Sequence, residues 1–341
     1  MPAAARIVIG LLLALMGAGL ALAVGLPLPW LLGPLLVTAA TRMMGWPGRC
    51  ARPFNIFGRW MIGLALGLYF TPAVMASLKT QWPLVLLGAV YALALAGLGY
   101  WVLRRMAGLD AATAWFSAAI GSASEMASMA QRHGARVDQV ASVHSLRVLL
   151  VVVIVPFAFQ WWYGLPPNVM VAVPVQWGGL ALLMAGAAVA GAVMQRLGVP
   201  SGWMMGALAF AGVLSVAGMP LSGLPPWLSW AGQLCIGWSL GDRYHPSFLR
   251  SAPRLMAVVA GTTLAFMAVS VVLAWIVTQV VDVPLGTLML ALAPGGIAEM
   301  TITAKVLNLG VPLVTAMHVT RLVVVVMTTG WLYRHFVRTR A

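Results

Sequence analysis

The stretch GGIAEMTITAKVLNLGVPLVTAMHVTR, residues 295–321, repeats the pattern of an earlier stretch, GSASEMASMAQRHGARVDQVASVHSLR, residues 121–147. At a constant offset of 174 residues, each stretch carries a glycine, a Glu-Met pair, a histidine and an arginine three residues after it. The matched positions are Gly121, Glu125, Met126, His144 and Arg147 in the first stretch, and Gly295, Glu299, Met300, His318 and Arg321 in the second. We infer that the chain contains a duplicated unit.

Two further matches extend the duplication over most of the chain. VGLPLPWLLGPL at residues 24–35 aligns with LGVPSGWMMGAL at 197–208, and GRWMIGLALGLYFTP at 58–72 aligns with GQLCIGWSLGDRYHP at 232–246. The sequence therefore predicts two membrane repeats, residues 1–170 and 171–341.

The first apolar segment, residues 7–24, could be read as a cleavable signal peptide. Its counterpart at 177–196 lies deep in the chain. The duplication therefore favours a membrane helix for both segments.

The composition predicts a membrane protein. Hydrophobic residues make up 62% of the chain and charged residues only 8%, whereas a soluble domain has about half apolar and a quarter charged residues. Each half contains six apolar segments, and most are long enough to cross about 30 Å of hydrocarbon as a helix. The segments are 7–25, 28–43, 54–71, 82–104, 110–131 and 137–163, then 177–196, 200–218, 227–243, 254–281, 285–308 and 312–333. We expect an all-α polytopic integral membrane protein.

The fifth segment of each half is interrupted. The breaks are Gly121-Ser122-Ala123-Ser124 in the first copy and Pro294-Gly295-Gly296 in the second, and such residues weaken or interrupt a helix. Two arms of about ten residues, each rising about 15 Å, would reach the bilayer centre and return. A re-entrant hairpin of this kind requires protein or a wet cavity around its turn.

The distribution of Lys and Arg selects between two topologies. If all twelve segments cross and the N-terminus is cytoplasmic, these residues divide ten inside and eight outside. If the two broken segments return to their side of entry, the division becomes sixteen to two. The residues that change side are Arg132, Arg136, Arg196, Arg243, Arg250 and Arg254. We therefore predict about ten crossings, two re-entrant hairpins and cytoplasmic termini. Five crossings per half invert the second repeat relative to the first, as in many secondary transporters.

The formal net charge of +14 would suggest a nucleic-acid partner in a soluble chain. Here the basic residues line one membrane face, where they set orientation, so no nucleic-acid partner is expected. Cys50 and Cys235 show no CxxC spacing, so neither a disulfide framework nor a zinc site is indicated.

The duplicated P-x-x-W-x-x-G element, the G-x-x-x-G segment ending in Pro, and the G-x-x-x-E-M stretch followed by H-x-x-R resemble the AbrB-type duplicated membrane protein family of Gram-negative bacteria. The resemblance covers nearly the whole chain and implies a bacterial inner (cytoplasmic) membrane location. The family is also labelled "ammonia monooxygenase" or regulator, and it implies a fold plan rather than a substrate. The plan of inverted repeats with hairpins is similar, in architecture only, to elevator-type anion and ion transporters.

Charged residues within apolar segments provide the candidate site. His144 and Arg147, and likewise His318 and Arg321, share a helix face at i, i+3 spacing. Each arginine would lie near the bilayer centre, where an unpaired charge is costly, so it should face the protein interior and find a partner. We predict that the two hairpin tips, their hydroxyls and these residues hold a small anion, while a Glu or His takes up a coupling proton. The predicted substrate-binding residues are Gly121, Ser122, Ser124, Glu125, His144, Arg147, Gly295, Gly296, Glu299, Thr301, His318 and Arg321.

A structural interpretation of the same residues stays open. Glu125 with Arg147, and Glu299 with Arg321, could be buried ion pairs that hold the hairpins on the neighbouring helices. Duplication does not separate the two interpretations, because symmetry would copy either one. Asp110, at a segment end, is predicted to be a helix cap or an interfacial charge, as are Asp138 and Asp282.

Two functions of different classes follow. The first is a secondary transporter or exporter of a small anionic or zwitterionic solute, coupled to a proton or sodium ion. Without a GxxxxGK[ST] motif, transport would be gradient-driven or would need a separate ATPase. The alternative is a membrane-embedded regulatory protein that acts through partners. No enzyme, cofactor or metal is expected, since five His and two Cys form no HxxxH, HxH or CxxC group. The lipid bilayer is the expected surrounding, and a homodimer stays open.

Overall fold

The structure, a computed structural model, describes residues 1–337 apart from 165–173, 220, 245 and 247–252; the side chains of Ser124 and Tyr163 also lie outside the description. The described residues are helical, with fifteen α-helices and one short π-helix among them. The prediction of an all-α chain is confirmed.

The chain folds into two compact units. Unit 1 comprises Met1–Lys79 and Pro156–Phe248, and unit 2 comprises Thr80–Val155 and Leu249–Ala341. Each unit thus draws on both predicted repeats, 1–170 and 171–341, because the chain leaves unit 1 for unit 2 partway through each repeat. The repeats are a property of the sequence, and the compact units cut across them.

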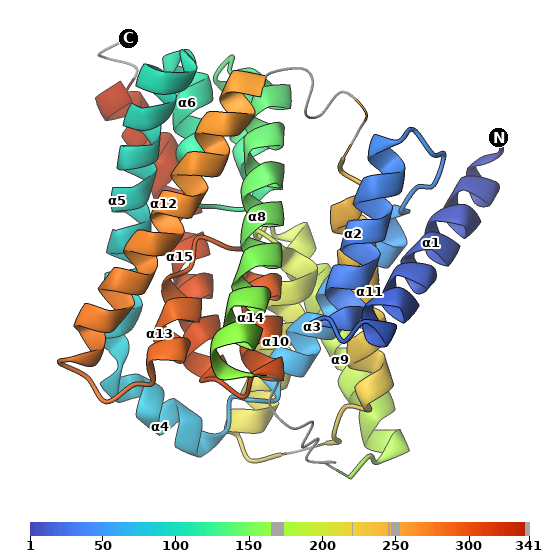
Figure 1. Ribbon diagram of the computed structural model, residues 1–341. Helices are drawn as coiled ribbons and strands as arrows, with labels where there is room; N and C mark the ends of the chain where they lie inside the picture. Colours follow the sequence, from blue (N-terminus) through green and yellow to red (C-terminus); the bar gives the residue numbers. More distant parts are fainter. Residues whose placement is uncertain (165–173, 220, 245, 247–252, 338–341) are drawn as a thin grey trace. The chain divides into compact units, whose positions relative to one another are not determined.

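Unit 1 contains α1 (Ala3–Ala23), α2 (Pro29–Met43), α3 (Arg52–Gly67), most of α4 (Pro72–Thr80), α9 (Trp177–Arg196), α10 (Gly202–Val216) and α11 (Pro226–Gly241). Unit 2 contains α5 (Trp82–Ala107), α6 (Ala111–Ala118), α7 (Ala123–Arg132), α12 (Pro253–Thr278), α13 (Leu285–Leu292), α14 (Ile297–Val306), α15 (Val311–Leu332) and the π-helix η1 (Tyr333–Val337). Helix α8 (Val137–Tyr163) begins in unit 2 and passes into unit 1 at Pro156. Figure 1 labels these elements.

Helix lengths repeat between the two halves. The pairs α2 and α10 have 15 residues each, α3 and α11 have 16, α5 and α12 have 26, α6 and α13 have 8, and α7 and α14 have 10. The duplication inferred from the sequence therefore extends to the order and length of the elements.

Six described helices are long and apolar enough to cross a membrane: α1, α5, α8, α9, α12 and α15. A seventh span results if α3 and α4, which meet at 85°, count as one bent span. Helices α2, α3, α10 and α11 are shorter, and 15 or 16 residues rise only about 24 Å. Helix α4 is not among the predicted segments. Helix α3 ends at Gly67, and Pro72 begins the new helix, where its missing N–H costs nothing.

Glycines bring the two copies together in unit 1. A Cβ on Gly237 of α11 would overlap the carbonyl oxygen of Leu31 in α2, and a Cβ on Gly63 of α3 would overlap that of Met204 in α10. These two contacts occupy equivalent positions of the two copies. Helices α3 and α11 meet at Gly58, where a Cβ would lie 2.9 Å from the carbonyl oxygen of Gly232, its own counterpart. In unit 1 the equivalent helices of the two copies therefore make equivalent close contacts.

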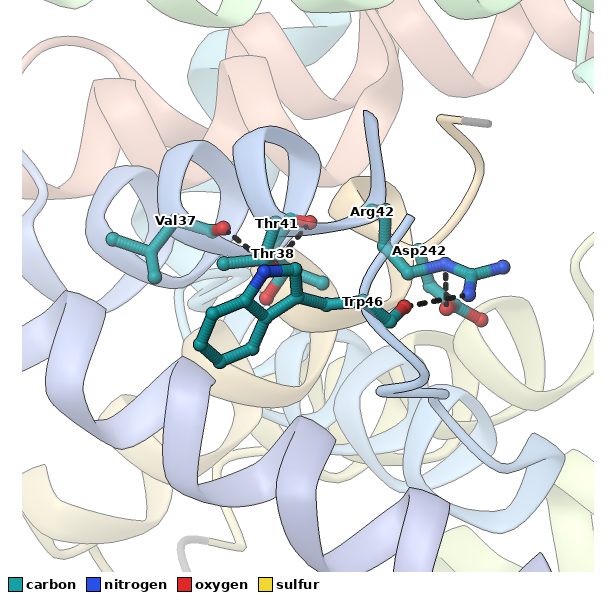
Figure 2. Close-up of polar contacts among 6 residues, drawn as sticks. All are labelled: Val37, Thr38, Thr41, Arg42, Trp46 and Asp242. Carbon is teal, nitrogen blue, oxygen red and sulfur yellow. Dashed lines mark hydrogen bonds and ion pairs between the residues drawn. The ribbon is translucent and has the colours of Figure 1, made fainter. Parts of the chain in front are cut away.

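An ion pair in unit 1 lies between two of these helices, α2 and α11. Figure 2 shows Arg42, in the last turn of α2, beside Asp242, the C-cap of α11; Arg42 Nε lies 3.2 Å from Asp242 Oδ1. At the equivalent place between α10 and α3, Ser215 Oγ donates a hydrogen bond of 3.2 Å to the carbonyl oxygen of Leu68. The two equivalent helix pairs therefore both have a polar contact here, an ion pair between α2 and α11 and a hydrogen bond between α10 and α3.

Candidate functional site

Both predicted hairpins lie in unit 2, and each is a pair of short helices joined by an extended break. In the first copy α6 ends at Ala118 and α7 begins at Ala123; in the second, α13 ends at Leu292 and α14 begins at Ile297. The residues that leave the first arm have the same conformation, φ −54° and ψ 128° at Ala119 and φ −56° and ψ 139° at Ala293. The predicted interruptions are confirmed, and the two copies share one backbone conformation where the first arm ends. The return of each segment to its side of entry stays a prediction.

The carbonyl groups at the end of α6 are bound by two side chains of α8. Arg147 donates from Nη2 to the carbonyl oxygen of Ala119 at 3.2 Å and from Nη1 to that of Ala118 at 3.4 Å. His144 Nε2 lies 2.9 Å from the carbonyl oxygen of Phe116. Because the last carbonyl groups of a helix lack partners within it and carry partial negative charge, a buried arginine is well placed there.

The second copy repeats this arrangement at equivalent positions. Arg321 of α15 donates from Nη1 to the carbonyl oxygen of Ala293 at 2.7 Å and from Nη2 to that of Gly295. His318 Nε2 lies 2.9 Å from the carbonyl oxygen of Leu290. Arg147 and Arg321 are each 6% exposed and both histidines are 1% exposed or less. Buried arginine thus joins each hairpin to its neighbouring long helix.

The hydrogen bonds fix the state of both histidines. In each copy the arginine Nη2 lies beside the histidine Nδ1, at 2.9 Å for Arg147 with His144 and 2.8 Å for Arg321 with His318. A guanidinium has no acceptor, so Nδ1 must accept, and Nε2 must carry the proton that it donates to a carbonyl oxygen. Both imidazoles are therefore neutral, and either histidine could take up a proton only by losing the hydrogen bond that its Nδ1 accepts from arginine.

The predicted glutamate–arginine ion pairs are absent from the described residues. Neither Glu125 with Arg147 nor Glu299 with Arg321 is among the ion pairs within 4.0 Å. Both arginines bind main-chain carbonyl oxygens, whereas the sequence had predicted glutamate carboxylates as their partners. The structural role of the arginines is therefore to cap a helix end rather than to neutralise a glutamate at contact distance.

Glu299 is buried without a partner. It lies in the first turn of α14, is 7% exposed, and its carboxylate forms no hydrogen bond or ion pair with any described residue. It remains within electrostatic range of Arg321, as do Arg147 and Tyr91. The centre of unit 2 therefore combines charged groups from both copies.

Glycine at the second tip allows this position of Glu299. A Cβ on Gly296 would overlap Oε2 of Glu299, which folds back over the tip. The equivalent residue of the first tip is Ser122, whose Cβ excludes that fold, and Glu125 is only partly buried. One side-chain difference at the tip thus explains why the two glutamates differ in burial.

Each hairpin tip packs against the long helix of the other copy. A Cβ on Gly121 would lie 3.3 Å from Val325 Cγ1 of α15, and a Cβ on Gly295 would lie 2.9 Å from Val151 Cγ1 of α8. Val151 and Val325 are themselves equivalent, so the two contacts are reciprocal. Each tip therefore packs against the other copy, and the predicted residues of both broken segments lie in unit 2.

The hydroxyl groups contribute less than predicted. Thr301 is fully buried and its Oγ1 donates back to the carbonyl oxygens of Ile297 and Ala298, at 2.6 and 3.2 Å. Ser122 is the N-cap of α7 without a side-chain capping bond, and the side chain of Ser124 lies outside the described residues. Gly296 likewise caps α14 without a side chain, so the first N–H groups of both helices lack a side-chain acceptor.

Two polar groups were missed by the sequence interpretation. Tyr91 Oη of α5 lies 2.8 Å from Ser270 Oγ of α12, and Ser270 also contacts the carbonyl oxygen of Leu292 at the end of α13. Figure 1 shows α5 and α12 running side by side. A single tyrosine or serine in an apolar helix gives little signal by itself, and only the fold brings these two together. Among the described residues, no group of three or more His, Cys, Asp or Glu could hold a metal ion.

The chain is similar to one known family and to two described proteins. The family model described as "AbrB: Transition state regulatory protein AbrB" matches residues 30–337. The chain is 28% identical to "Uncharacterized protein YhjN" of Bacillus subtilis (strain 168), over 91% of this chain and 88% of that protein. It is also 28% identical to "Putative regulator AbrB" of Escherichia coli (strain K12), over 94% of this chain and 93% of that protein. No solved structure matches the chain.

Proposed function

The chain belongs to the AbrB family and is an all-helical, membrane-type protein, and we propose that it is a secondary transporter of a small anionic or zwitterionic solute. The solute site is the centre of unit 2, between the hairpin tips and helices α8 and α15. Transport is driven by an ion or proton gradient rather than by ATP hydrolysis.

An orphaned donor at this centre carries the proposal. Arg147 is 6% exposed, and its Nε has no hydrogen-bond partner among the described residues. A buried guanidinium N–H without an acceptor costs free energy, and an anionic group would remove that cost. The α7 and α14 N-termini add uncapped N–H groups and the positive ends of two helix dipoles.

The membrane arrangement of the proposal is that of an inverted repeat. About ten crossings and two re-entrant hairpins, with both termini in the cytoplasm of a bacterial inner membrane, would bring the interrupted segments to the bilayer midplane. Reciprocal packing of the tips against Val151 and Val325 supports one shared site rather than two separate ones. In this plan the two arginines cap half-helices and also set the charge of the site.

The experiment is a binding screen with purified protein in detergent. Lactate, methanesulfonate, succinate, glutamate and phosphate are tested as probes by thermal shift at pH 5.5 and 7.5. At least one anion should raise the melting temperature of the wild type, and Arg147→Gln should lose that response while remaining folded. Trp115→Phe is the matched control, because it removes another hydrogen bond of unit 2, from Nε1 to the carbonyl oxygen of Thr329 at 3.0 Å. The proposal fails if none of the five anions stabilises the wild type at either pH.

The names of the relatives support a second candidate function. The matching family model and the Escherichia coli relative are both named as regulators, which favours a membrane-embedded regulatory protein acting through partners. The same screen separates the two, since a protein that acts only through partners should show no response to small anions that depends on Arg147.

A further inference from the structure

We propose that Glu299 is the proton-binding group of unit 2, and that protonation of its carboxylate and binding of the anionic solute are coupled. This inference rests on the proposed function, which it deepens by naming the coupling ion and its acceptor. It follows from the burial of Glu299, from the geometry of the tip and from the charges around it.

The first step concerns the cost of the buried carboxylate. Glu299 is 93% buried and forms no hydrogen bond or ion pair with a described residue. Buried charges in proteins are normally paired and hydrogen-bonded, because removal from water is expensive. A change in the charge of this carboxylate therefore breaks no hydrogen bond, and the electrostatic interaction with Arg321 is the interaction that it alters.

The second step concerns the groups around it. Helix α14 packs on α13, which has no titratable side chain, and on α15, which provides His318 and Arg321. Arg147 of α8 and Tyr91 of α5 are in electrostatic range of Arg321, and Lys305 lies on α14 itself. Both histidines are held neutral by their hydrogen bonds to arginine and to a carbonyl oxygen. Glu299 is therefore the acidic group of this centre best placed to exchange a proton.

The third step concerns competition between two negative charges. An anionic solute at Arg147 and an ionised Glu299 would share the positive field of the same two arginines. Like charges at short range inside a protein repel strongly, since the effective dielectric constant is low. A proton on Glu299 removes this repulsion, so the solute and the proton bind together.

The surroundings favour a proton over a metal cation. A hard cation needs several oxygen ligands, and the described residues include no acidic cluster that could supply them. Thr301 and Thr303 donate their hydroxyl protons back to helix carbonyl oxygens. The guanidinium of Arg321, which is in electrostatic range of Glu299, also repels a metal cation.

The test begins without any solute. Infrared titration of the purified protein between pH 8 and pH 5 follows the carbonyl stretch of protonated carboxyl groups. A component should appear on acidification in the wild type and in Glu125→Gln, the matched control from the first copy, and should be missing in Glu299→Gln. The inference is overturned if Glu299→Gln shows the same titrating component, or if the component assigned to Glu299 does not change with pH.

The second arm measures coupling with lactate and methanesulfonate, which keep their charge over this range. The apparent Kd of a bound anion should rise with pH by up to about tenfold per pH unit in the wild type, as expected when one proton is taken up per anion. Glu299→Gln should bind the anion with a pH-independent Kd close to the low-pH value of the wild type. A pH dependence that persists in Glu299→Gln overturns the inference but leaves the proposed function intact. If neither anion binds at any pH, the solute proposal fails while the infrared result still decides whether Glu299 carries a proton.

A variant of the tip checks the geometry by a different route. Gly296→Ser introduces the Cβ that Ser122 has in the first copy and should displace the Glu299 carboxylate from its buried position. Modification of Glu299 by a carbodiimide, measured by mass spectrometry, should then rise toward that of Glu125. Unchanged protection of Glu299 in Gly296→Ser would contradict the position from which the coupling is inferred.

Discussion

At the scale of single residues, the histidine–arginine pairs act as helix caps. Their partners are main-chain carbonyl groups, which every residue has, so the sequence carries no sign of them. The sequence indicated that Arg147 and Arg321 need buried partners, and the nearest residues of opposite charge were Glu125 and Glu299. The structure gives the arginines carbonyl oxygens instead, and this difference leaves Glu299 available for another role.

Replacing His318 with phenylalanine tests the cap. The change removes the donor to the carbonyl oxygen of Leu290 and the acceptor for Arg321 Nη2. Two buried polar groups lose a partner, which at about 1–3 kcal/mol each should lower the free energy of unfolding by about 2–5 kcal/mol. Urea unfolding in detergent measures the loss. A decrease below about 0.5 kcal/mol would show that these hydrogen bonds do not hold the hairpin.

Asp110 provides a pH-dependent contribution at the start of α6. Its carboxylate accepts from the N–H of Thr113 at 2.8 Å and lies 3.4 Å from Arg136 Nε. Burial raises the pKa of Asp110, but the hydrogen bonds from Thr113 and the charge of Arg136 outweigh burial and hold the pKa below its usual value. Asp110 was predicted to be a helix cap or an interfacial charge, and the structure confirms the cap.

A folded-state pKa below the unfolded value means that Asp110 stabilises the protein above the unfolded pKa, and that this contribution is lost as the pH falls through the folded pKa. Wild type should therefore melt higher than Asp110→Asn at pH 7, and the two should converge on acidification below about pH 4. Both partners are about half exposed, so the difference should be small and should shrink in high salt. Melting curves of the two proteins across pH check it, and a difference that grows on acidification would contradict the assigned sign.

At the scale of elements, the broken helices could be predicted closely. The sequence placed interruptions at 121–124 and 294–296, and the structure has the breaks at 119–122 and 293–296. Glycine, serine and proline give a local signal for such breaks. Helix contacts gave no comparable signal, since a glycine in an apolar helix looks alike whether it meets lipid or another backbone.

Gly241 and Gly261 are examples of a glycine that meets another helix and of one that does not. A Cβ on Gly241 of α11 would lie 2.7 Å from both the carbonyl oxygen of Leu35 and Thr38 Cβ, whereas a Cβ on Gly261 of α12 meets nothing within 4 Å. Gly241→Ala should lower the free energy of unfolding by about 1–3 kcal/mol, because the helices must move apart. Gly261→Ala should leave it unchanged or raise it, since alanine is the better helix former. Unfolding of both variants in the same detergent gives the comparison, and equal effects would contradict the contact between α2 and α11.

At the scale of the whole molecule, the duplication was visible in the sequence but the two compact units were not. Equivalent residues reveal a repeat through their identities, while membership of a unit depends on contacts between segments far apart in the chain. Each unit pairs elements of one copy with elements of the other, as α3 pairs with α11 in unit 1 and α5 with α12 in unit 2. Such pairing requires the three-dimensional structure.

The proposed topology has its own test. Cysteine labelling of intact cells with an impermeant reagent should leave position 136 and both termini protected, because Lys and Arg accumulate on the cytoplasmic face. Position 168, which lies outside the described residues, should label from outside. Labelling of position 136 from outside together with protection of position 168 would contradict the inverted repeat.

The central claim is that the two copies build one site in unit 2, with each hairpin tip on the long helix of the other copy. Disulfide cross-linking measures this most directly, after the free cysteines Cys50 and Cys235 have been replaced by alanine. The pairs Gly121→Cys with Val325→Cys and Gly295→Cys with Val151→Cys should each form a disulfide, since the contacts at both tips are close enough for one. Each single-cysteine variant serves as the control for folding. Cross-linking of both pairs within one chain is the predicted result, and two well-folded double variants that fail to cross-link would contradict the shared site.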